Sequence, residues 1–148
     1  MSVAFRKMTF AVTMVCLVLP SSAYSLACGA LMSVANEPDM NDAIACYNIG
    51  NIDSTISVSN NFTATTSLEA ITPSASTQLN IVGNGNKITF AGSAGNLFAI
   101  NNGALVVEDI ELENTADSAI FAEGNAAVTV NDMIFDNNGH ALHVTVHP

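Results

Sequence analysis

Two segments in the C-terminal half of the chain repeat one alternation of apolar and polar residues. The first is NGALVVEDIELEN, residues 102–114, and the second is NAAVTVNDMIFDN, residues 125–137. Such alternation indicates strands with one buried face, because successive side chains of a strand point to opposite sides of the sheet. Leu97 aligns with Ile120, Leu105 with Val128 and Asn114 with Asn137, all at the same offset. A constant offset over consecutive strands predicts that each copy stacks on the next.

A period in the low twenties, with several short strands in each period, is typical of a solenoid. Each turn of such a fold buries its inner face only against its neighbours. Alternation then assigns the side chains that we expect to point inward. These are Leu79, Ile81, Ile88, Phe90, Leu97, Ala99, Leu105, Val107, Ile110, Leu112, Ile120, Ala122, Val128, Val130, Met133 and Phe135.

Small or amide residues recur where the stacked strands would turn. Gly92, Asn114 and Asn137 follow one another at about the same spacing. Gly and Asn are the residues that most readily accept a left-handed backbone. We therefore expect these three residues to form a column at one corner of the fold.

The N-terminal segment, positions 1–27, has the pattern of a secretory signal peptide. Arg6 and Lys7 precede a short apolar run, and small residues allow cleavage after Ala23 or Ala27. The run is shorter than the about 20 apolar residues of a membrane-spanning helix. The sequence therefore predicts an exported protein, located outside the cell, at the outer membrane or cell surface, or in the periplasm.

Loss of the signal peptide would leave a strongly acidic chain. Lys87 would remain alone against all 13 Asp and Glu residues, which gives a formal net charge of −12. Such a surface repels phosphate backbones, so we expect no nucleic-acid partner. The protein is also not expected to be an integral membrane protein.

Residues 28–50 contain the one helix predicted after the signal peptide, and Asp39 or Asn41 are its candidate N-caps. Cys16 belongs to the signal peptide, which leaves Cys28 and Cys46 in a chain that meets an oxidising compartment. We expect a disulfide between them. The sequence leaves open whether Cys28 instead carries a lipid anchor or the protein is freely secreted.

The segments NDAIACYN (41–48), DSTI (53–56) and LNIVGNG (79–85) together resemble the N-terminal, CSLREA-like region of a family of secreted bacterial proteins. These are right-handed parallel β-helix proteins with a pectate-lyase-like fold, of the polymorphic outer-membrane and autotransporter-passenger type. The resemblance implies an all-β, right-handed parallel β-helix. With the repeats, it predicts about four coils over residues 51–148 and a short N-terminal capping helix within 28–50.

Stacked carboxylates are the sharpest candidates for a functional site. The offset stacks Asp109 on Asp132 and Glu113 on Asp136. Paired carboxylates at roughly 5–9 Å could act as acid and base on a glycosidic bond. Carboxylate oxygens are also Ca²⁺ ligands. We interpret the four residues as solvated outer-face residues, with a Ca²⁺ site and catalysis as the alternatives, and we expect no catalytic residue and no cofactor.

Three histidines, His140, His143 and His147, lie close together near the end of the sequence. No carboxylate or cysteine lies nearby in sequence to complete a zinc site, so we interpret them as surface residues. The spacing puts His143 in an outward column with Phe98 and Phe121.

These observations favour a non-enzymatic secreted or cell-surface protein of the adhesin or structural-passenger kind. The alternative is a carbohydrate-active enzyme, a hydrolase or lyase of the same fold. Residues 140–148 begin a further coil, which we interpret as the end of a fragment of a longer protein or as a face that docks a partner. The expected partners are the remainder of such a chain, a glycan, or a host or cell-surface protein. The sequence does not specify the oligomeric state.

Overall fold

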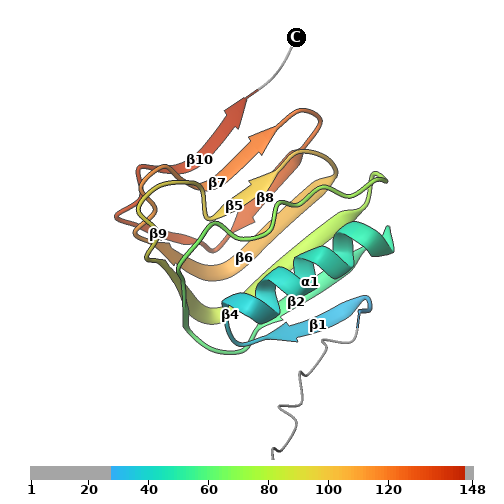
Figure 1. The fold of residues 1–148 in the computed structure, drawn as a ribbon, viewed down its shortest axis with the longest axis horizontal. Helices are drawn as coiled ribbons and strands as arrows, with labels where there is room; N and C mark the ends of the chain where they lie inside the picture. The colour runs from blue at the N-terminus through green and yellow to red at the C-terminus, as the bar shows by residue number, and fades with distance from the viewer. Residues whose placement is uncertain (1–27, 146–148) are drawn as a thin grey trace, which may run out of the picture.

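The structure, a computed structural model, describes residues 28–145, which form one α-helix and ten β-strands (Figure 1). The helix α1 spans Glu37–Gly50. The strands are β1 Leu31–Val34, β2 Ser54–Val58, β3 Phe62–Ala64, β4 Gln78–Phe90, β5 Phe98–Ile100, β6 Ala104–Glu113, β7 Ser118–Glu123, β8 Ala127–Asn131, β9 Ile134–Asp136 and β10 His140–Thr145. The signal-peptide prediction, on residues 1–27, lies outside the described residues.

The strands form two sheets in which every pair is parallel. The larger sheet has seven strands in the order β1-β2-β4-β6-β8, with β3 also on β4 and β9 also on β6. The smaller sheet has three strands in the order β10-β7-β5. Figure 1 shows β1 at one end of the molecule and β10 at the other. In sequence, α1 lies between the paired strands β1 and β2, β5 of the smaller sheet lies between β4 and β6, and β7 lies between β6 and β8.

The predicted fold class, an all-β right-handed parallel β-helix of about four coils, is wrong. The described residues form an α/β-like arrangement of one helix and two separate parallel sheets. The helix is a layer of its own, since α1 packs on β1, β2 and β3 and buries Met40, Ala43, Ile44 and Tyr47. Alternation reports which residues share a face, and both faces of a parallel sheet need cover. The alternation of residues does not specify whether a helix or further strands pack over the second face of the sheet.

The offset between the two repeated segments is the register of β6 with both β8 and β9. β6 and β8 pair Leu105 with Val128 and Val107 with Val130, as the sequence alignment predicts. In the smaller sheet, however, β5 pairs Phe98, and not Leu97, with Ile120. The predicted alignment of Leu97 with Ile120 is therefore wrong by a single position, and such a slip exchanges the two faces of a strand. Phe98 is buried and Ala99 is only half-buried, the reverse of the prediction.

Helix α1 begins with a sequence signal that the prediction missed. The side chain of Asn36 accepts a hydrogen bond from the backbone N–H of Asp39 at 2.9 Å, and Pro38 lies in the first turn. The predicted caps Asp39 and Asn41 are therefore wrong, because both lie inside the helix. Asn51 follows the helix with a left-handed backbone, φ 50°, which ends it.

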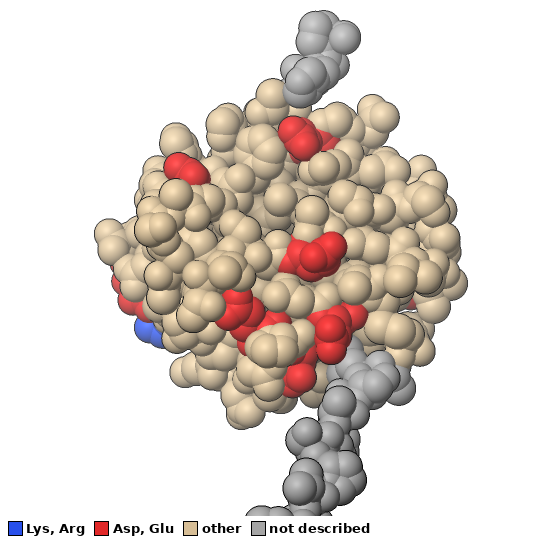
Figure 2. All heavy atoms as spheres, viewed as in Figure 1, with Lys and Arg blue, Asp and Glu red and all other residues tan. Residues whose placement is uncertain are grey.

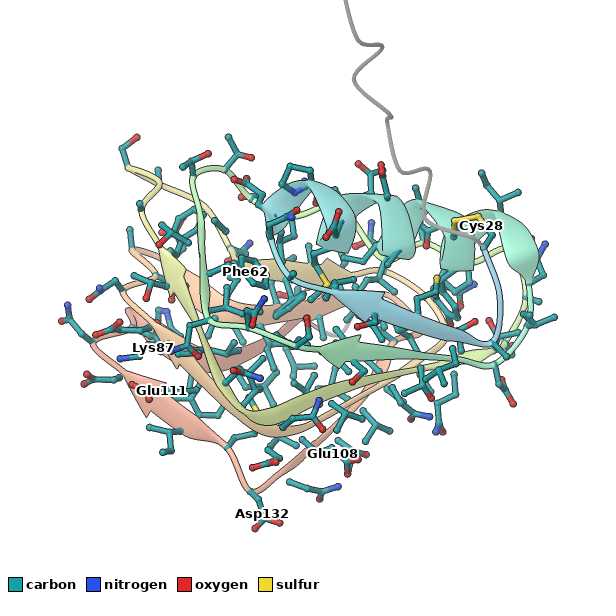
Figure 3. All side chains as sticks on the ribbon, turned by 90° about the horizontal axis from the view of Figure 1, so that it is seen from below. Cys28, Phe62, Lys87, Glu108, Glu111 and Asp132 are labelled. Carbon is teal, nitrogen blue, oxygen red and sulfur yellow. A yellow bond between two sulfur atoms is a disulfide. The ribbon has the colours of Figure 1, made fainter. Side chains whose placement is uncertain are left out.

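The predicted disulfide between Cys28 and Cys46 is present (Figure 3). It joins the residues before β1 to the last half of α1, across 18 positions of sequence. The bond ties the edge strand of the larger sheet to the helix that covers that sheet.

Candidate functional site

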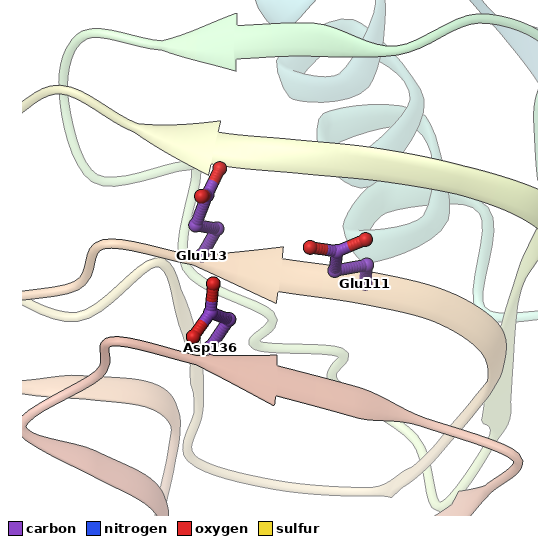
Figure 4. A group of neighbouring side chains, drawn as sticks. All are labelled: Glu111, Glu113 and Asp136. Carbon is purple, nitrogen blue, oxygen red and sulfur yellow. The ribbon is translucent and has the colours of Figure 1, made fainter.

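One group of carboxylates lies on the outer face of the larger sheet (Figure 4). Glu111 and Glu113 come from β6, and Asp136 comes from β9. Residues two apart in a strand share a face, so both glutamates point the same way. Glu113 is paired with Asp136 in the register of β6 and β9. Oxygens of the three carboxylates lie within 4.8 Å of one another, the one such group of metal-ligating residues among positions 28–145.

A lysine from the neighbouring strand neutralises part of this group. Lys87 Nζ on β4 lies 3.1 Å from Glu111 Oε1 and 3.5 Å from Glu113 Oε2. Figure 3 labels Lys87 and Glu111 on their neighbouring strands. The hydrogen bond to Glu111 and the charges of Glu111 and Glu113 raise the pKa of Lys87. The ammonium group therefore neutralises two of the three carboxylates, and Lys87, Glu111 and Glu113 form a half-buried ion-pair network at the surface of the sheet.

The carboxylates predicted from the sequence divide into two sets. Glu113 and Asp136 lie in the group in Figure 4, but Asp109 and Asp132 do not. Asp109 and Asp132 have left-handed backbones, with φ 52° and 49°, and are exposed where the strands bend. Glu111 was missed by the sequence reasoning. Its position two residues before Glu113, on the same face, was the available signal.

The three residues of the predicted corner column differ in conformation. Asn114 and Asn137 have φ angles of 67° and 50°, and Asn137 Nδ2 donates a hydrogen bond to Asn114 Oδ1 at 2.7 Å. Gly92 is not among the residues with positive φ, and an added Cβ there would collide with the Phe90 ring. The asparagines are thus linked across two strand layers, whereas Gly92 makes room for an aromatic ring.

Two of the three histidines lie together on β10. The rings of His140 and His143 have centroids 5.5 Å apart, and His143 meets the Phe121 ring edge-on at 5.4 Å. Phe121 and His143 are paired in the register of β7 and β10. His147 lies outside the described residues. Within the described part, neither histidine joins a group of three metal-ligating side chains.

A polar pocket that the sequence did not predict opens beside the starts of β4 and β6. Its volume is about 600 Å³, and its lining residues are Asp53, Ser76, Thr77, Gln78, Asn102, Gly103, Ala104 and Asn125. One oxygen of Asp53 accepts a hydrogen bond from the Gln78 N–H at 2.8 Å. Asp53 is the one titratable side chain in this lining, so the pocket lacks the second group that acid–base catalysis on a glycosidic bond requires.

The strands β8, β9 and β10 form an edge at which core positions become exposed. We call these three strands the open edge. Val130 is paired with Val107, and their exposed fractions are 37% and 0%. Leu142 is paired with Ile120, and theirs are 38% and 0%. The side chains of the open edge repeat the pattern of a buried layer, but in the described residues nothing packs over them.

Figure 2 shows acidic side chains spread over one face of the molecule, with basic side-chain atoms at its margin. The helix of the described part of the chain, α1, has 14 residues and does not qualify as a membrane-spanning helix. Comparison of the chain with protein-family models, with curated proteins and with solved structures finds no match.

Proposed function

We propose that this protein is a non-enzymatic exported protein of the cell envelope or cell surface, and that it acts by binding a partner at the open edge. The observation that carries the proposal is the exposure of side chains in β8 and β10 whose counterparts one layer earlier are buried. Exposed apolar residues grouped on a sheet edge are typical of protein interaction sites.

Two further observations support this proposal. The disulfide between Cys28 and Cys46 is the kind of bond that persists in exported proteins. The Cys28 sulfur in that bond is not free to carry a lipid, so we favour export without a lipid on this residue. Among the described residues, the carboxylate group is bound to Lys87 and the polar pocket has a single titratable group. Neither arrangement resembles a catalytic pair.

The test begins with expression of the full chain and separation of the cytoplasmic, envelope and external fractions. We expect the protein outside the cytoplasm, with its first residue at position 24 or 28 by mass spectrometry. Purified protein incubated with a panel of polysaccharides should release neither reducing ends nor unsaturated sugars. Release of either product would establish the carbohydrate-active enzyme instead, and cytoplasmic protein that retains residues 1–27 would refute export.

A further inference from the structure

In the described residues, the open edge has backbone without a neighbouring strand as well as exposed side chains. Within residues 28–145, β8 and β9 pair only with β6, and β10 pairs only with β7. In this part of the chain, the other side of each strand presents N–H and C=O groups without a strand partner, and such groups can accept a further strand. An added strand would also cover the half-exposed Val128 and Phe135.

The charge of the open edge determines which kind of strand can be added to it. Asp132 and Asp136 are exposed along the β8–β9 side of the open edge. A second copy of this protein would bring the same carboxylates. Its one Lys or Arg within the described residues, Lys87, is already bound to Glu111 and Glu113. Like charges directly opposite each other on neighbouring strands are destabilising, so a second copy is disfavoured and a basic segment is favoured.

The pairing of β4 with β6 shows how a basic residue on a neighbouring strand can bind these carboxylates. Lys87 on β4 is paired with Glu111, and it also reaches Glu113 two residues further on. In the next step, Ile134 of β9 takes the place opposite Glu111, and Asp136 lies opposite Glu113. Asp136 therefore adds a carboxylate to the column without adding a cation. A Lys or Arg opposite Ile134 on a further strand would reach Asp136 as Lys87 reaches Glu113.

We propose that the β8–β9 side of the open edge binds an extended segment of a basic partner protein, which adds to the larger sheet as one more strand. The segment alternates apolar residues, which cover Val128, Val130 and Phe135, with outward residues that include a Lys or Arg opposite Ile134. This inference rests on the proposed function, since it names the kind of partner that the open edge binds.

The probe is a synthetic peptide with the sequence of residues 78–90, QLNIVGNGNKITF, which has the required alternation and carries Lys87. Its matched control has glutamate in place of that lysine. Binding of each labelled peptide to the purified exported protein is measured by fluorescence anisotropy. We expect saturable binding, with the lysine peptide about two- to fivefold tighter than the glutamate peptide, the range of a cross-strand charge pair.

Three variants of the protein make the test specific. Asp136→Lys should reverse the preference between the peptides. Val130→Lys puts a charge on the apolar side of β8 and should abolish binding, whereas Thr129→Lys adds the same charge on the outward side of that strand and should retain it. Circular dichroism checks that each variant is folded, and the comparison of the two peptides needs no variant.

Three results would overturn this inference. They are equal affinity for the two peptides, no binding to the folded protein, and a dimer in sedimentation that Val130→Lys dissociates, which would make a second copy the occupant. Peptide binding together with sugar release would refute the non-enzymatic part of the proposed function but leave binding at the open edge, on which this inference rests, standing. Absence of both would refute this inference alone.

Discussion

Single residues join parts of the chain that are distant in sequence, and Glu37 is the clearest case. Its carboxylate accepts four hydrogen bonds, from the backbone N–H and the hydroxyl of both Thr65 and Thr66, at 2.8–3.1 Å. Burial alone would raise the pKa of Glu37, but these four hydrogen bonds outweigh it and lower the pKa. The first turn of α1 is thereby fastened to the segment that follows β3.

Glu37→Gln should reduce the free energy of unfolding at pH 7 by about 1–2 kcal/mol, because the bonds to Thr65 and Thr66 lose their charge. The folded pKa lies below the ordinary value of 4.5, so this stabilisation is present above pH 4.5 and is lost as pH falls through the folded pKa. Urea denaturation of both proteins at pH 7 and pH 3 measures it. Glu69→Gln, at an exposed carboxylate, is the control and should change stability by less than about 0.5 kcal/mol. A Glu37→Gln deficit that is equal at both pH values would contradict the prediction.

At the scale of elements, β4 bends where its pairing with β6 shifts between Val82 and Asn86. Gly83 is at this irregularity, and an added Cβ there would collide with the Asp109 carbonyl oxygen. Gly85, two residues further on, has φ 72° and nothing within 4 Å of such a Cβ. Gly83 is thus required because the β6 backbone lies too close for a side chain, whereas Gly85 is favoured because its backbone is left-handed.

Gly83→Ala should destabilise the protein by about 2–3 kcal/mol or more, since β6 backbone would have to move. Gly85→Asn is the matched control, because asparagine tolerates a left-handed backbone, and it should cost less than about 1 kcal/mol. Thermal denaturation monitored by circular dichroism compares them. Equal losses for the two variants would contradict the role given to the β4–β6 contact.

The disulfide connects β1 to α1, two elements that the core already holds together. Replacing both Cys28 and Cys46 with alanine should lower the free energy of unfolding by about 3 kcal/mol, the loop-closure contribution for this separation. Denaturant titration of the double variant and of wild type, oxidised and reduced, measures the loss. Reduced wild type should match the double variant. Equal stability of reduced and oxidised wild type would refute the prediction.

The sequence predicted strand register and the disulfide better than it predicted which elements pack over the faces of the sheets. The β6–β8 register and the disulfide could be read from the sequence, because strand alternation and paired cysteines are local or compositional signals. The fold class could not, because alternation does not report what covers the second face of a sheet. Of the carboxylate group, Glu113 and Asp136 were recognised by their alignment. Lys87 could be expected to offset the acidic face as the one basic residue left after position 27, but its partners Glu111 and Glu113 could not be named, because the reach of its side chain across strands has no sequence signal.

For the whole molecule, the two ends of the larger sheet differ in their cover. β1 lies under α1 and is fastened by the disulfide, whereas the open edge has strand pairing on one side only among the described residues. Stability should therefore decline from β4 and β6 towards β8, β9 and β10, because each successive layer has fewer packed neighbours. The strands β8, β9 and β10, which a bound partner would stabilise most, are therefore also expected to be the least stable part of the described residues.

Lys87 is the one residue after position 27 at which trypsin can cut, because the rest of the sequence to Pro148 has no other Lys and no Arg. The bond after Lys87 lies inside β4, where Ile88 is paired with Phe62 on one side and with Leu112 on the other. A protease can bind this bond only after the middle of the sheet has separated. Digestion should therefore yield two fragments and no partial products, at a rate that follows the opening of the central strands.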